Sequence, residues 1–557
     1  MAQNKSLQIT PTLIDRLVSW ANPSAGLSRF RARATIQALE TTGYIVPGSS
    51  RRAMRGWNPT AGTADQDTLA SLEKSRTGCR DLAMNTPIAR AALKRELTNV
   101  VGWGLTLQSR IDREVLGLTD EAAEKWIRNV EHEFRTWASS PECDIERTLT
   151  FYELQGLSLY NTSLSGDVFV LLPYQERSGF PYKLRVQIIE GDWVSNPGNT
   201  QDTMQLAGGV EVDVNGAPVA YHFRKIDPKM SLSMVNMNSA GMFRWERIPA
   251  FGAVSGRRNV LHMYHKERPA QRRGMPTLAP VVEILKQMSR LTEAELMASV
   301  VSSFFTVFIK TNSTLGGLTE GFVPEEKVTD STANIADQNI YEMGNGSIIE
   351  LGGEGQDISI ADPKRPNQAF EPFFMAMVKQ IGSALEIPFE QLLLHFDASY
   401  SAARGAMLEA WKFYRHRRQW LSRRFCQPVY EAWLDDVVSS GRVDAPGYFD
   451  DPAIKVAWAG SYWGGPGQGQ IDPLRETQAA QQRIEWYLST WEDEYTAIHG
   501  TDWNTSLARG AREREMIAEK ELPLPSTKQS APSAPAETLP SAPAKPKSQP
   551  QPQPEEE

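Results

Sequence analysis

The segment Leu385–Leu421 reads LEIPFEQLLLHFDASYSAARGAMLEAWKFYRHRRQWL and contains the pattern that decides the fold. A helical spacing of apolar residues covers Ala369–Leu385 and stops at Ile387-Pro388, because a residue that precedes proline disfavours the helical conformation. Helical spacing resumes at about Ser401 and continues to about Val438. The sequence therefore predicts two helices that are separated by a short irregular loop.

The second of these helices is strongly basic. Between residues 404 and 424 it carries one acid, Glu409, and seven cations: Arg404, Lys412, Arg415, Arg417, Arg418, Arg423 and Arg424. Interleaved aromatic residues such as Trp411 and Trp420 give it the composition of a helix that contacts nucleic acid. Several aromatics recur at helical spacing, however, which favours packing of the aromatic side chains. In this interpretation the basic face of the helix pairs with acidic residues of the same subunit or of another subunit. Direct contact with DNA is the alternative.

A long helix with one broad apolar face is predicted upstream, from Pro276 to about Ile309. The Gly-rich, β-leaning insert Lys310–Asp362 separates this helix from Ala369–Leu385, and it contains Ile348, Glu350 and Leu351. Two helices that flank a small β module form a stalk with a tip. This arrangement indicates a projection, and not a ligand pocket.

The region before about Thr150 is predicted to be mainly helical, over Cys79–Val101 and Glu121–Ala138. Short β-type runs follow, at 167–172, 184–189, 209–214, 219–224 and 260–264. Asn215-Gly216 between two of these runs predicts a hairpin with a type I′ turn. The basic cluster Lys266–Arg273 is interpreted either as a contact for phosphates or an acidic partner, or as a solvated loop.

The C-terminal part changes character near Glu521. Residues 472–520 are predicted to form helices, whereas 521–557 are dense in Pro, Ala, Ser and Gln and nearly free of large apolar side chains. Such a segment buries too little surface to offset its ordering entropy, so we expect an extended, mobile tail. The sequence PSAP occurs twice in it and matches a bare PxxP spacing, but a spacer role is favoured.

Composition excludes several classes of protein. The 557 residues are 41% hydrophobic and 23% charged, which describes a chain of several folded units. The net charge of -8 excludes a generally basic, nucleic-acid-binding surface. Three widely spaced cysteines favour a reducing cytosol, and neither a signal peptide nor an apolar run long enough to span a bilayer is recognised.

A search for catalytic motifs finds none of the common ones. GxxxxGK[ST], GxSxG and HExxH are all missing, and the stretch GNGSIIELGGEG at 344–355 fails the GxGxxG pattern. His262 and His265 lie close together but lack a third ligand in the local sequence, so strand-end and surface roles are favoured over a metal pair. We therefore expect no catalytic residue, no metal site and no cofactor.

Several segments together resemble the lambda-type family of bacteriophage portal proteins. They are RDLAMNTP at 80–87, ERPAQRRGMPTLAP at 267–280, the opening segment 385–421 with FCQPVYEAWL, then IDPLRETQAA at 471–480 and AREREMIAEKELPLP at 511–525. The segments occur in the right order over roughly Arg80–Pro525. The first fifty or so residues and the Pro-rich tail lie outside the clear resemblance.

The resemblance implies an α+β portal fold with a wing, a long-helix stem, a small β-containing clip and a helical crown, assembled as a ring of about twelve subunits. The corresponding parts of this chain are an N-terminal region with the α/β wing (1–275), a stem helix (276–309), the clip (310–365), a second stem helix (366–387), a tunnel loop (388–401), a long wing helix (402–445), a crown-like region (446–520) and the disordered tail (521–557).

The family also implies function and partners. Portals form a channel at one capsid vertex through which the terminase motor packages double-stranded DNA, which is later ejected; they nucleate head assembly and dock head-tail connector proteins. The partners implied are further copies, the terminase large subunit, connector or adaptor proteins, and the major capsid and scaffolding proteins, with no membrane. The implied locations are the virion and, during assembly, the host cytoplasm.

Candidate residues follow from this assignment. His395, Phe396 and Asp397 fall in the tunnel loop and Lys379 on the helix before it, where they are candidates to face DNA. Ile348, Glu350 and Leu351 are clip candidates for docking the motor or connector. Arg404, Lys412, Arg415 and Arg418 keep both interpretations, packing or DNA. The acidity of the chain suits a conduit through which DNA slides. Each contact between a cation of the wall and a phosphate would add affinity for DNA and slow its movement.

Two other classes of protein remain as alternatives. A nuclease or motor subunit of the packaging system requires a nucleotide or metal site, for which the motifs are missing. A cytosolic DNA-binding adaptor that uses the basic helix 404–424 requires tight, salt-dependent binding of DNA.

Overall fold

The computed structural model describes residues 59, 61–226, 242–303, 307–311, 356–360, 369–395, 400–469, 472–500 and 503–520. The chain divides into two compact units, 1–71 with 267–271, and 72–266 with 272–557. In the first unit, Arg268 forms an ion pair with Asp67 and donates a hydrogen bond from Nη2 to the Gly62 carbonyl at 3.1 Å.

The helical region near the N-terminus begins with α3 (Ala64–Asn85) and α4 (Pro87–Val100). The prediction of one helix over 79–101 is wrong, because Pro87 starts a new helix and Thr86 adopts an extended conformation. The helical path ends at about Val101 as predicted, and the following Gly102 and Gly104 both have positive φ. Helices α5 (Arg113–Leu116) and α6 (Asp120–Ala138) follow, and α6 confirms the predicted helix to within one residue.

Helix α7 (Phe151–Ser165) supports the centre of the unit. Thr150 and Glu153 form a complete capping box at its start, which satisfies two free backbone N–H groups. An aromatic cluster surrounds its first residue: Phe134 lies edge-on to Phe151 at 5.6 Å, and Phe151 stacks on Phe425 at 5.5 Å. Trp137 and Trp433 are fully buried in the same cluster. The core therefore joins residues that lie almost 300 positions apart in the chain.

Two small antiparallel sheets follow, and the first of them packs against this helical core through Val168, Val170 and Met263. One has the order β3-β2-β8, from β2 (Asp167–Leu171), β3 (Gln187–Glu190) and β8 (Val260–Tyr264). The other has the order β4-β5-β6-β7, from β4 (Leu206–Ala207), β5 (Val210–Val212), β6 (Pro218–Ile226) and β7 (Phe243–Pro249). A small second core around Phe169 and Phe223 lies between them.

The β-type runs at 167–172, 219–224 and 260–264 are confirmed closely, but two details of the prediction are wrong. In the run 184–189 only 187–189 belong to a strand, with Leu184 and Val186 in isolated bridges. The hairpin between β5 and β6 forms as predicted, yet not with a type I′ turn. Gly216 alone has positive φ, and Asp213 Oδ1 accepts hydrogen bonds from the N–H groups of Asn215 and Ala217.

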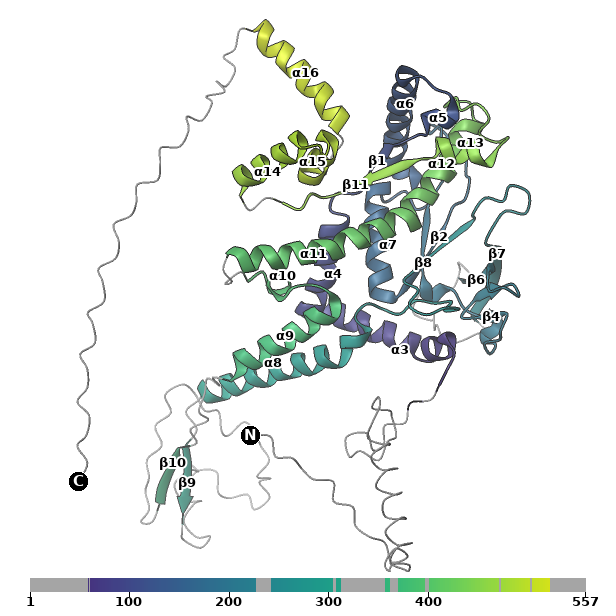
Figure 1. Ribbon diagram of the computed structural model, residues 1–557. Coiled ribbons are helices and arrows are strands. Elements are labelled where there is room, and N and C mark those ends of the chain that lie inside the picture. The colour runs from purple at the N-terminus through teal and green to yellow at the C-terminus, as the bar shows by residue number, and fades with distance from the viewer. Residues whose placement is uncertain are drawn as a thin grey trace, which may run out of the picture. The chain divides into compact units, whose positions relative to one another are not determined.

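The two stem candidates, α8 (Val282–Ser303) and α9 (Phe370–Leu385), contact each other along their length (Figure 1). Helix α8 is shorter than the predicted 276–309 because a 3₁₀ turn occupies Ala279–Val281 and a strand begins at Val307. Strands β9 (Val307–Thr311) and β10 (Gln356–Ile360), which lie between α8 and α9 in the sequence, pair with each other in antiparallel orientation. Ile348, Glu350 and Leu351 lie outside the described residues.

After the predicted break at Pro388, a short helix α10 (Phe389–Leu393) precedes α11 (Tyr400–Leu421). A π-helical turn, Ser422–Cys426, connects α11 directly to α12 (Gln427–Ser439), so the predicted helix from Ser401 to Val438 is confirmed as one continuous helical path. Next come α13 (Pro452–Trp458) and β11 (Ser461–Gly464), which pairs with β1 (Thr106–Ser109).

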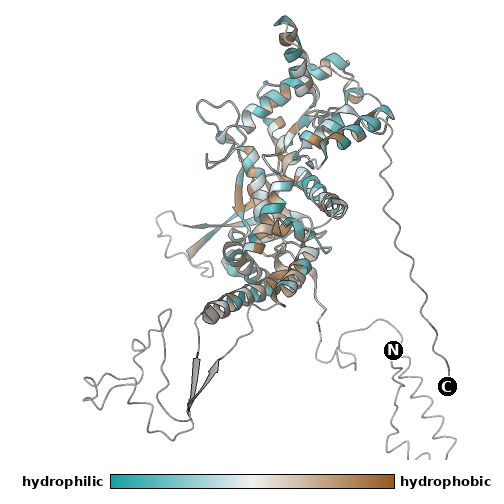
Figure 2. Cartoon of the chain, turned by 90° about the vertical axis from the view of Figure 1, so that its left-hand side faces the viewer, coloured by the Kyte–Doolittle hydropathy of each residue, from teal (hydrophilic) through white to brown (hydrophobic). Residues whose placement is uncertain are grey.

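The C-terminal part of the unit consists of α14 (Pro473–Glu485), α15 (Trp491–His499) and α16 (Trp503–Glu519). Helices were predicted throughout this stretch and are found there. The outer helices alternate hydrophilic and hydrophobic residues, as amphipathic helices do (Figure 2). Among the described helices, none is long and apolar enough to cross a membrane.

Candidate functional site

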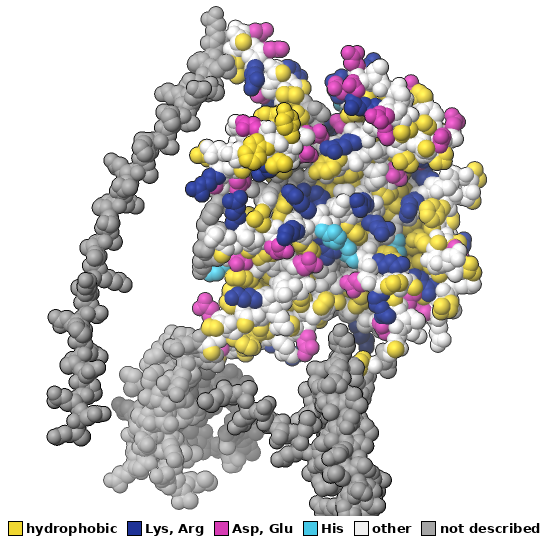
Figure 3. Space-filling model, viewed as in Figure 1, with side chains coloured by type: hydrophobic (Ala, Val, Ile, Leu, Met, Phe, Trp, Pro, Cys, Tyr) yellow, Lys and Arg dark blue, Asp and Glu magenta, His cyan; other side chains and the backbone are white. Residues whose placement is uncertain are grey.

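One face of α11 lines a large groove of the unit. Residues spaced three or four apart on a helix share a face, and the groove is lined from α11 by Arg404, Leu408, Trp411, Arg415, Arg418 and Ser422. Its opposite wall comes from β11, the loop after it, α14 and α15, and it encloses about 1420 Å³. The space-filling view shows dark blue Lys and Arg side chains across the same part of the surface (Figure 3).

Some of the predicted basic residues are used for packing within the chain. Arg418 Nε donates to the Val100 carbonyl at 3.1 Å, and its Nη2 donates to the carbonyls of Asn99 and Pro466, both at 2.9 Å. It thereby caps the C-terminal end of α4, where helix carbonyls lack partners. Burial lowers the pKa of Arg418 to about 10, which leaves it charged at neutral pH.

Arg417 lies on a different side of the helix and forms a buried ion pair. Its Nε lies 3.2 Å from Glu96 Oε1, and its guanidinium contacts the ring nitrogen of His265. Burial, followed by the charge of Arg417, lowers the pKa of His265 to about 3, so this histidine is neutral at physiological pH. Lys412, in contrast, is exposed and pairs with Glu409 at 2.6 Å.

Arg404, Arg415 and Arg423 are different, because all three are exposed in the groove and none has an acidic partner among the residues that the structure describes. The opposite wall contributes the acids Glu476, Asp493 and Glu494, and Glu494 forms two hydrogen bonds with Arg483 at 2.6 and 2.7 Å. Seven arginines line the groove against these three acids, so it presents an excess of positive charge beside the indole of Trp411.

A second hollow of about 550 Å³ lies between the end of α9, α10 and α11. It brings together Lys379 and Lys412, two residues that were predicted separately. Lys379 Nζ lies 4.9 Å above the ring of Phe389, in a cation–π contact. Gly382 is required at the tight approach of the chain here, because a Cβ at this position would lie 2.5 Å from the Ile387 carbonyl oxygen.

The predicted tunnel loop is only partly described. His395 donates its backbone N–H to the Glu390 carbonyl at 3.0 Å. Helix α10 ends at Leu393, and Leu394, which follows it, is a non-glycine residue with positive φ. Phe396 and Asp397 lie outside the described residues.

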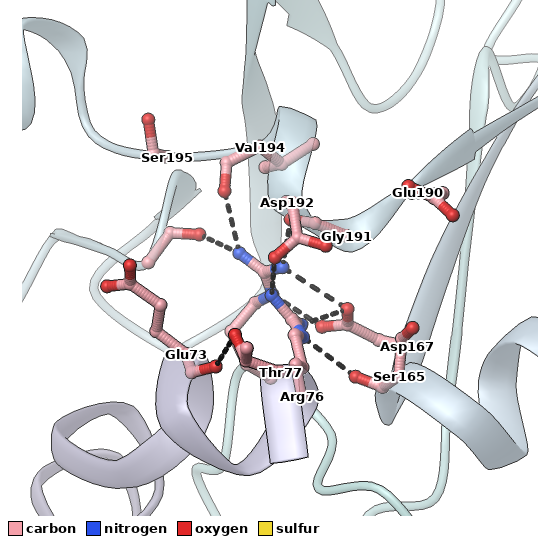
Figure 4. Close-up of polar contacts among 12 residues, drawn as sticks. Glu73, Arg76, Thr77, Ser165, Asp167, Glu190, Gly191, Asp192, Val194 and Ser195 are labelled. Atoms are coloured by element: carbon pink, nitrogen blue, oxygen red, sulfur yellow. Dashed lines mark hydrogen bonds and ion pairs between the residues drawn. The ribbon is translucent and has the colours of Figure 1, made fainter. Parts of the chain in front are cut away.

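A buried charge cluster, which the sequence did not reveal, centres on Asp167 at the start of β2 (Figure 4). Its carboxylate forms ion pairs with Arg76 from α3 and with Arg273 from the segment after β8, and all three side chains are at most 5% exposed. Arg76 Nε also donates to the Ser165 carbonyl at 2.7 Å, and Arg273 Nη2 donates to the Gly191 carbonyl at 2.6 Å. The cluster joins a helix, a strand and the segment that leads to α8.

The electrostatics of this cluster favour the charged carboxylate. Burial raises the pKa of Asp167, but Arg273 and Arg76 outweigh burial and hold the pKa well below its ordinary range. His262 Nε2 lies 3.3 Å from Asp167 Oδ2, and burial lowers the pKa of this histidine. Both interpretations of Lys266–Arg273 are therefore wrong for Arg273, which neither lies in a solvated loop nor is exposed to phosphates. The only sequence signal was the local density of arginines.

The described residues contain no group of three or more His, Cys, Asp and Glu side chains arranged to hold a metal ion. All three cysteines are buried. Burial raises the pKa of Cys79 to about 11 and that of Cys143 to about 12, so both thiols stay protonated at neutral pH. In chemical terms, the arrangement offers exposed cations along a groove and apolar surfaces for contact.

Comparison with known proteins gives the class and then the family. A family model described as "Phage portal protein, lambda family" matches residues 50–418, which is well over half of the chain. The protein is a phage portal protein. Within that class, it belongs to the lambda family.

The chain is similar along most of its length to individual relatives. It is 25% identical over 493 residues to Portal protein B of Escherichia phage lambda, which covers 85% of this chain and 90% of the lambda protein. It is 25% identical over 479 residues to the portal protein of Escherichia phage N15, which covers 83% of this chain and 87% of that protein. Among solved structures, a chain from the neck of an empty GTA particle with C6 symmetry is 14% identical, with a TM-score of 0.43, over 81% of this chain and 98% of that one.

Proposed function

We propose that the chain assembles into a ring around a DNA channel at one vertex of the phage head. Through this channel the terminase motor packages double-stranded DNA, and the DNA leaves by it on ejection. The observation that carries the proposal is the match of the lambda-family portal model over residues 50–418. The role is structural, with ATP hydrolysis left to the separate motor.

The proposed parts of the subunit follow the order of its elements. The sheets and the helices α3–α7 form the wing, α8 and α9 the stem, and the β9–β10 pair the base of the clip. Helix α11 with α12 is the long wing helix, the chain between α10 and α11 is the tunnel loop, and α14–α16 form the crown. We propose that the clip docks terminase and connector proteins, while the wing contacts capsid and scaffolding proteins in the host cytoplasm during assembly.

Ring formation is the first step to test. Negative-stain class averages of the purified full chain are expected to show rings, and mass photometry is expected to give a mass of about twelve subunits. A monodisperse monomer at every concentration would refute the proposal.

We further propose that Arg404 and Arg415 contact DNA as it passes. Both are exposed in the groove, both lack an acidic partner among the described residues, and Trp411 lies between them on the same face. A ring of about twelve subunits at -8 each would carry on the order of a hundred negative charges, so most of the wall would repel DNA and only such local cations would touch it. Contact at a few positions guides a sliding polyanion without holding it tightly.

The test compares charge removal in the groove with charge removal elsewhere. The double variant Arg404→Ala/Arg415→Ala is expected to reduce packaged DNA per particle in a defined packaging reaction while rings still form. Arg113→Ala and Arg128→Ala, combined, form a matched control, because both arginines are exposed and pair with Asp120 and Glu124 on the outside of α6. Equal packaging by the two double variants would refute a DNA contact in the groove.

A further inference from the structure

The turn between α14 and α15 exposes an unusual concentration of large apolar side chains. Trp486, Tyr487, Leu488 and Trp491 are 73%, 96%, 72% and 60% exposed, and we call them the aromatic turn. In the space-filling view, yellow side chains gather over α14 and α15 (Figure 3). Contiguous exposed apolar patches of this kind mark interaction sites in soluble proteins.

The backbone of the aromatic turn is held in one conformation although its side chains face water. The N–H groups of Trp486, Tyr487 and Leu488 donate to the carbonyls of Gln482, Ile484 and Arg483, at 3.0, 3.0 and 2.9 Å. Tyr487 has a φ of 57°, in the left-handed region that a tyrosine enters only at a cost in free energy. A preorganised aromatic surface loses little further conformational freedom on binding, which favours its use as an anchor.

Helix α16 presents a second surface without a partner. Its first turn is supported by α15, where Trp503 stacks on Trp491 at 5.9 Å and Tyr495 Oη contacts Ser506 Oγ at 2.8 Å. Beyond Ser506 the helix is exposed at nearly every position. The helical repeat places small and apolar residues on one face of this exposed part, namely Leu507, Gly510, Ala511, Ile517 and Ala518. A helix of 17 residues with support at one end is marginally stable in water, so it requires packing elsewhere.

We propose that the aromatic turn of one subunit packs against the exposed face of α16 in a neighbouring copy of the chain. This inference rests on the proposed ring and names the contact that joins its C-terminal helices. In a closed ring, each subunit presents the same two surfaces, so a contact between unlike surfaces covers both of them in every copy.

Charge complementarity supports the same pairing. Arg514 lies in the middle of the apolar face of α16 and has no acidic partner among the described residues. Glu485, directly before the aromatic turn, is exposed and is contacted only by the neutral side chain of Gln481, at 2.7 Å, in the part of the chain that the structure describes. The contact would bring these opposite charges together at its edge.

Engineered cysteines test the contact directly in the full chain. Because the native cysteines are all buried, they do not compete for a surface disulfide. Leu488→Cys combined with Ala511→Cys or with Ala518→Cys is expected to give a ladder of covalently linked subunits on a non-reducing gel of oxidised rings. Trp103→Cys combined with Ala511→Cys is the control, since Trp103 is 96% exposed but lies between α4 and β1. Rings that yield no ladder with either pair would overturn the inference while leaving the ring itself intact.

Charge substitution gives an independent readout. Tyr487→Asp/Leu488→Asp changes only exposed side chains, so the thermal unfolding of the subunit is expected to be unchanged. The subunit concentration at which half of the chains are in rings, measured by mass photometry, is expected to rise about tenfold or more. Loss of a single aromatic anchor from a protein interface has an effect of this size. Trp103→Asp is expected to assemble like the unmodified chain. Unimpaired assembly of the double variant would contradict the inference, and monomers of the unmodified chain would overturn both the inference and the ring.

Discussion

Replacing Asp167 by asparagine is expected to destabilise the subunit strongly. The substitution keeps the size of the side chain but removes the negative charge at the centre of the buried cluster. Arg76 and Arg273, whose side chains are 5% and 2% exposed, would lose their closest carboxylate. An uncompensated buried charge costs about 3–5 kcal/mol of unfolding free energy. A loss of this size is a large fraction of the free energy of unfolding of an ordinary domain, which is about 5–15 kcal/mol.

The measurement is urea unfolding of the full chain, followed by tryptophan fluorescence, with hydrogen exchange at the β2 amides as a local readout. Asp120→Asn provides the control, because Asp120 and its partner Arg113 have side chains that are 78% and 57% exposed, and such a pair contributes at most about 1 kcal/mol. If Asp167→Asn loses no more stability than Asp120→Asn, the ion pairs of the cluster do not stabilise the fold.

The dependence on pH follows from the direction of the pKa shift. The pKa of Asp167 is lower in the folded state than in the unfolded chain, so its contribution is fully present above the unfolded pKa of about 4 and is lost as the pH falls below it. The difference between Asp167→Asn and the unmodified chain is therefore expected to be constant from about pH 5 to 8 and to narrow below about pH 4. A difference that narrows at neutral pH would refute this assignment of charge.

Two further predictions concern single positions. His265 has a folded pKa of about 3, below its unfolded value of about 6.5, so acidification from neutral pH to about pH 5 is expected to remove about 2 kcal/mol of unfolding free energy. His265→Gln is expected to flatten this dependence in urea titrations. Gly166→Ala is expected to lower the unfolding free energy by about 2 kcal/mol or more, because its φ is 88° and a Cβ would lie 2.4 Å from the Gly274 carbonyl oxygen. Gly117→Ala is the control, because Gly117 has a φ of 62° and a Cβ there would meet no atom, so this variant measures only the cost of the backbone conformation. An equal loss of unfolding free energy in the two variants would contradict the proposed clash at Gly166.

Elements with strong local signals could be predicted from the sequence. Helix α6 has apolar residues at helical spacing and a Thr119 cap, and its predicted bounds are correct to within one residue. Helix α9 ends at Leu385 as predicted, where Glu386 adopts the left-handed conformation, and Ile387 beyond it is restricted by Pro388 through local sterics. The same local rule was overlooked at Pro87, where the helical periodicity continues through the break between α3 and α4.

The candidate site could be predicted only in part, because the role of a cation depends on distant parts of the chain. Arg418 is separated by more than 300 residues from the Asn99 and Val100 carbonyls that it caps, and the sequence contains no signal for that pairing. Arg273 and Asp167 are separated by 106 residues. Helical spacing does show which residues share a face of α11, and the groove lined by Arg404 and Arg415 agrees with it.

The basic helix 404–424 carries two kinds of cation, and neither kind is confined to one end, because Arg415 and Arg423 are exposed in the groove like Arg404. Toward its C-terminal end, Arg417 and Arg418 are committed to Glu96 and to the end of α4, so their charges are spent inside the subunit. Toward its N-terminal end, Arg404 is exposed and follows directly on the segment proposed as the tunnel loop. Arg417 and Arg418 anchor the helix within the subunit, and we propose that the exposed Arg404 and Arg415 contact DNA.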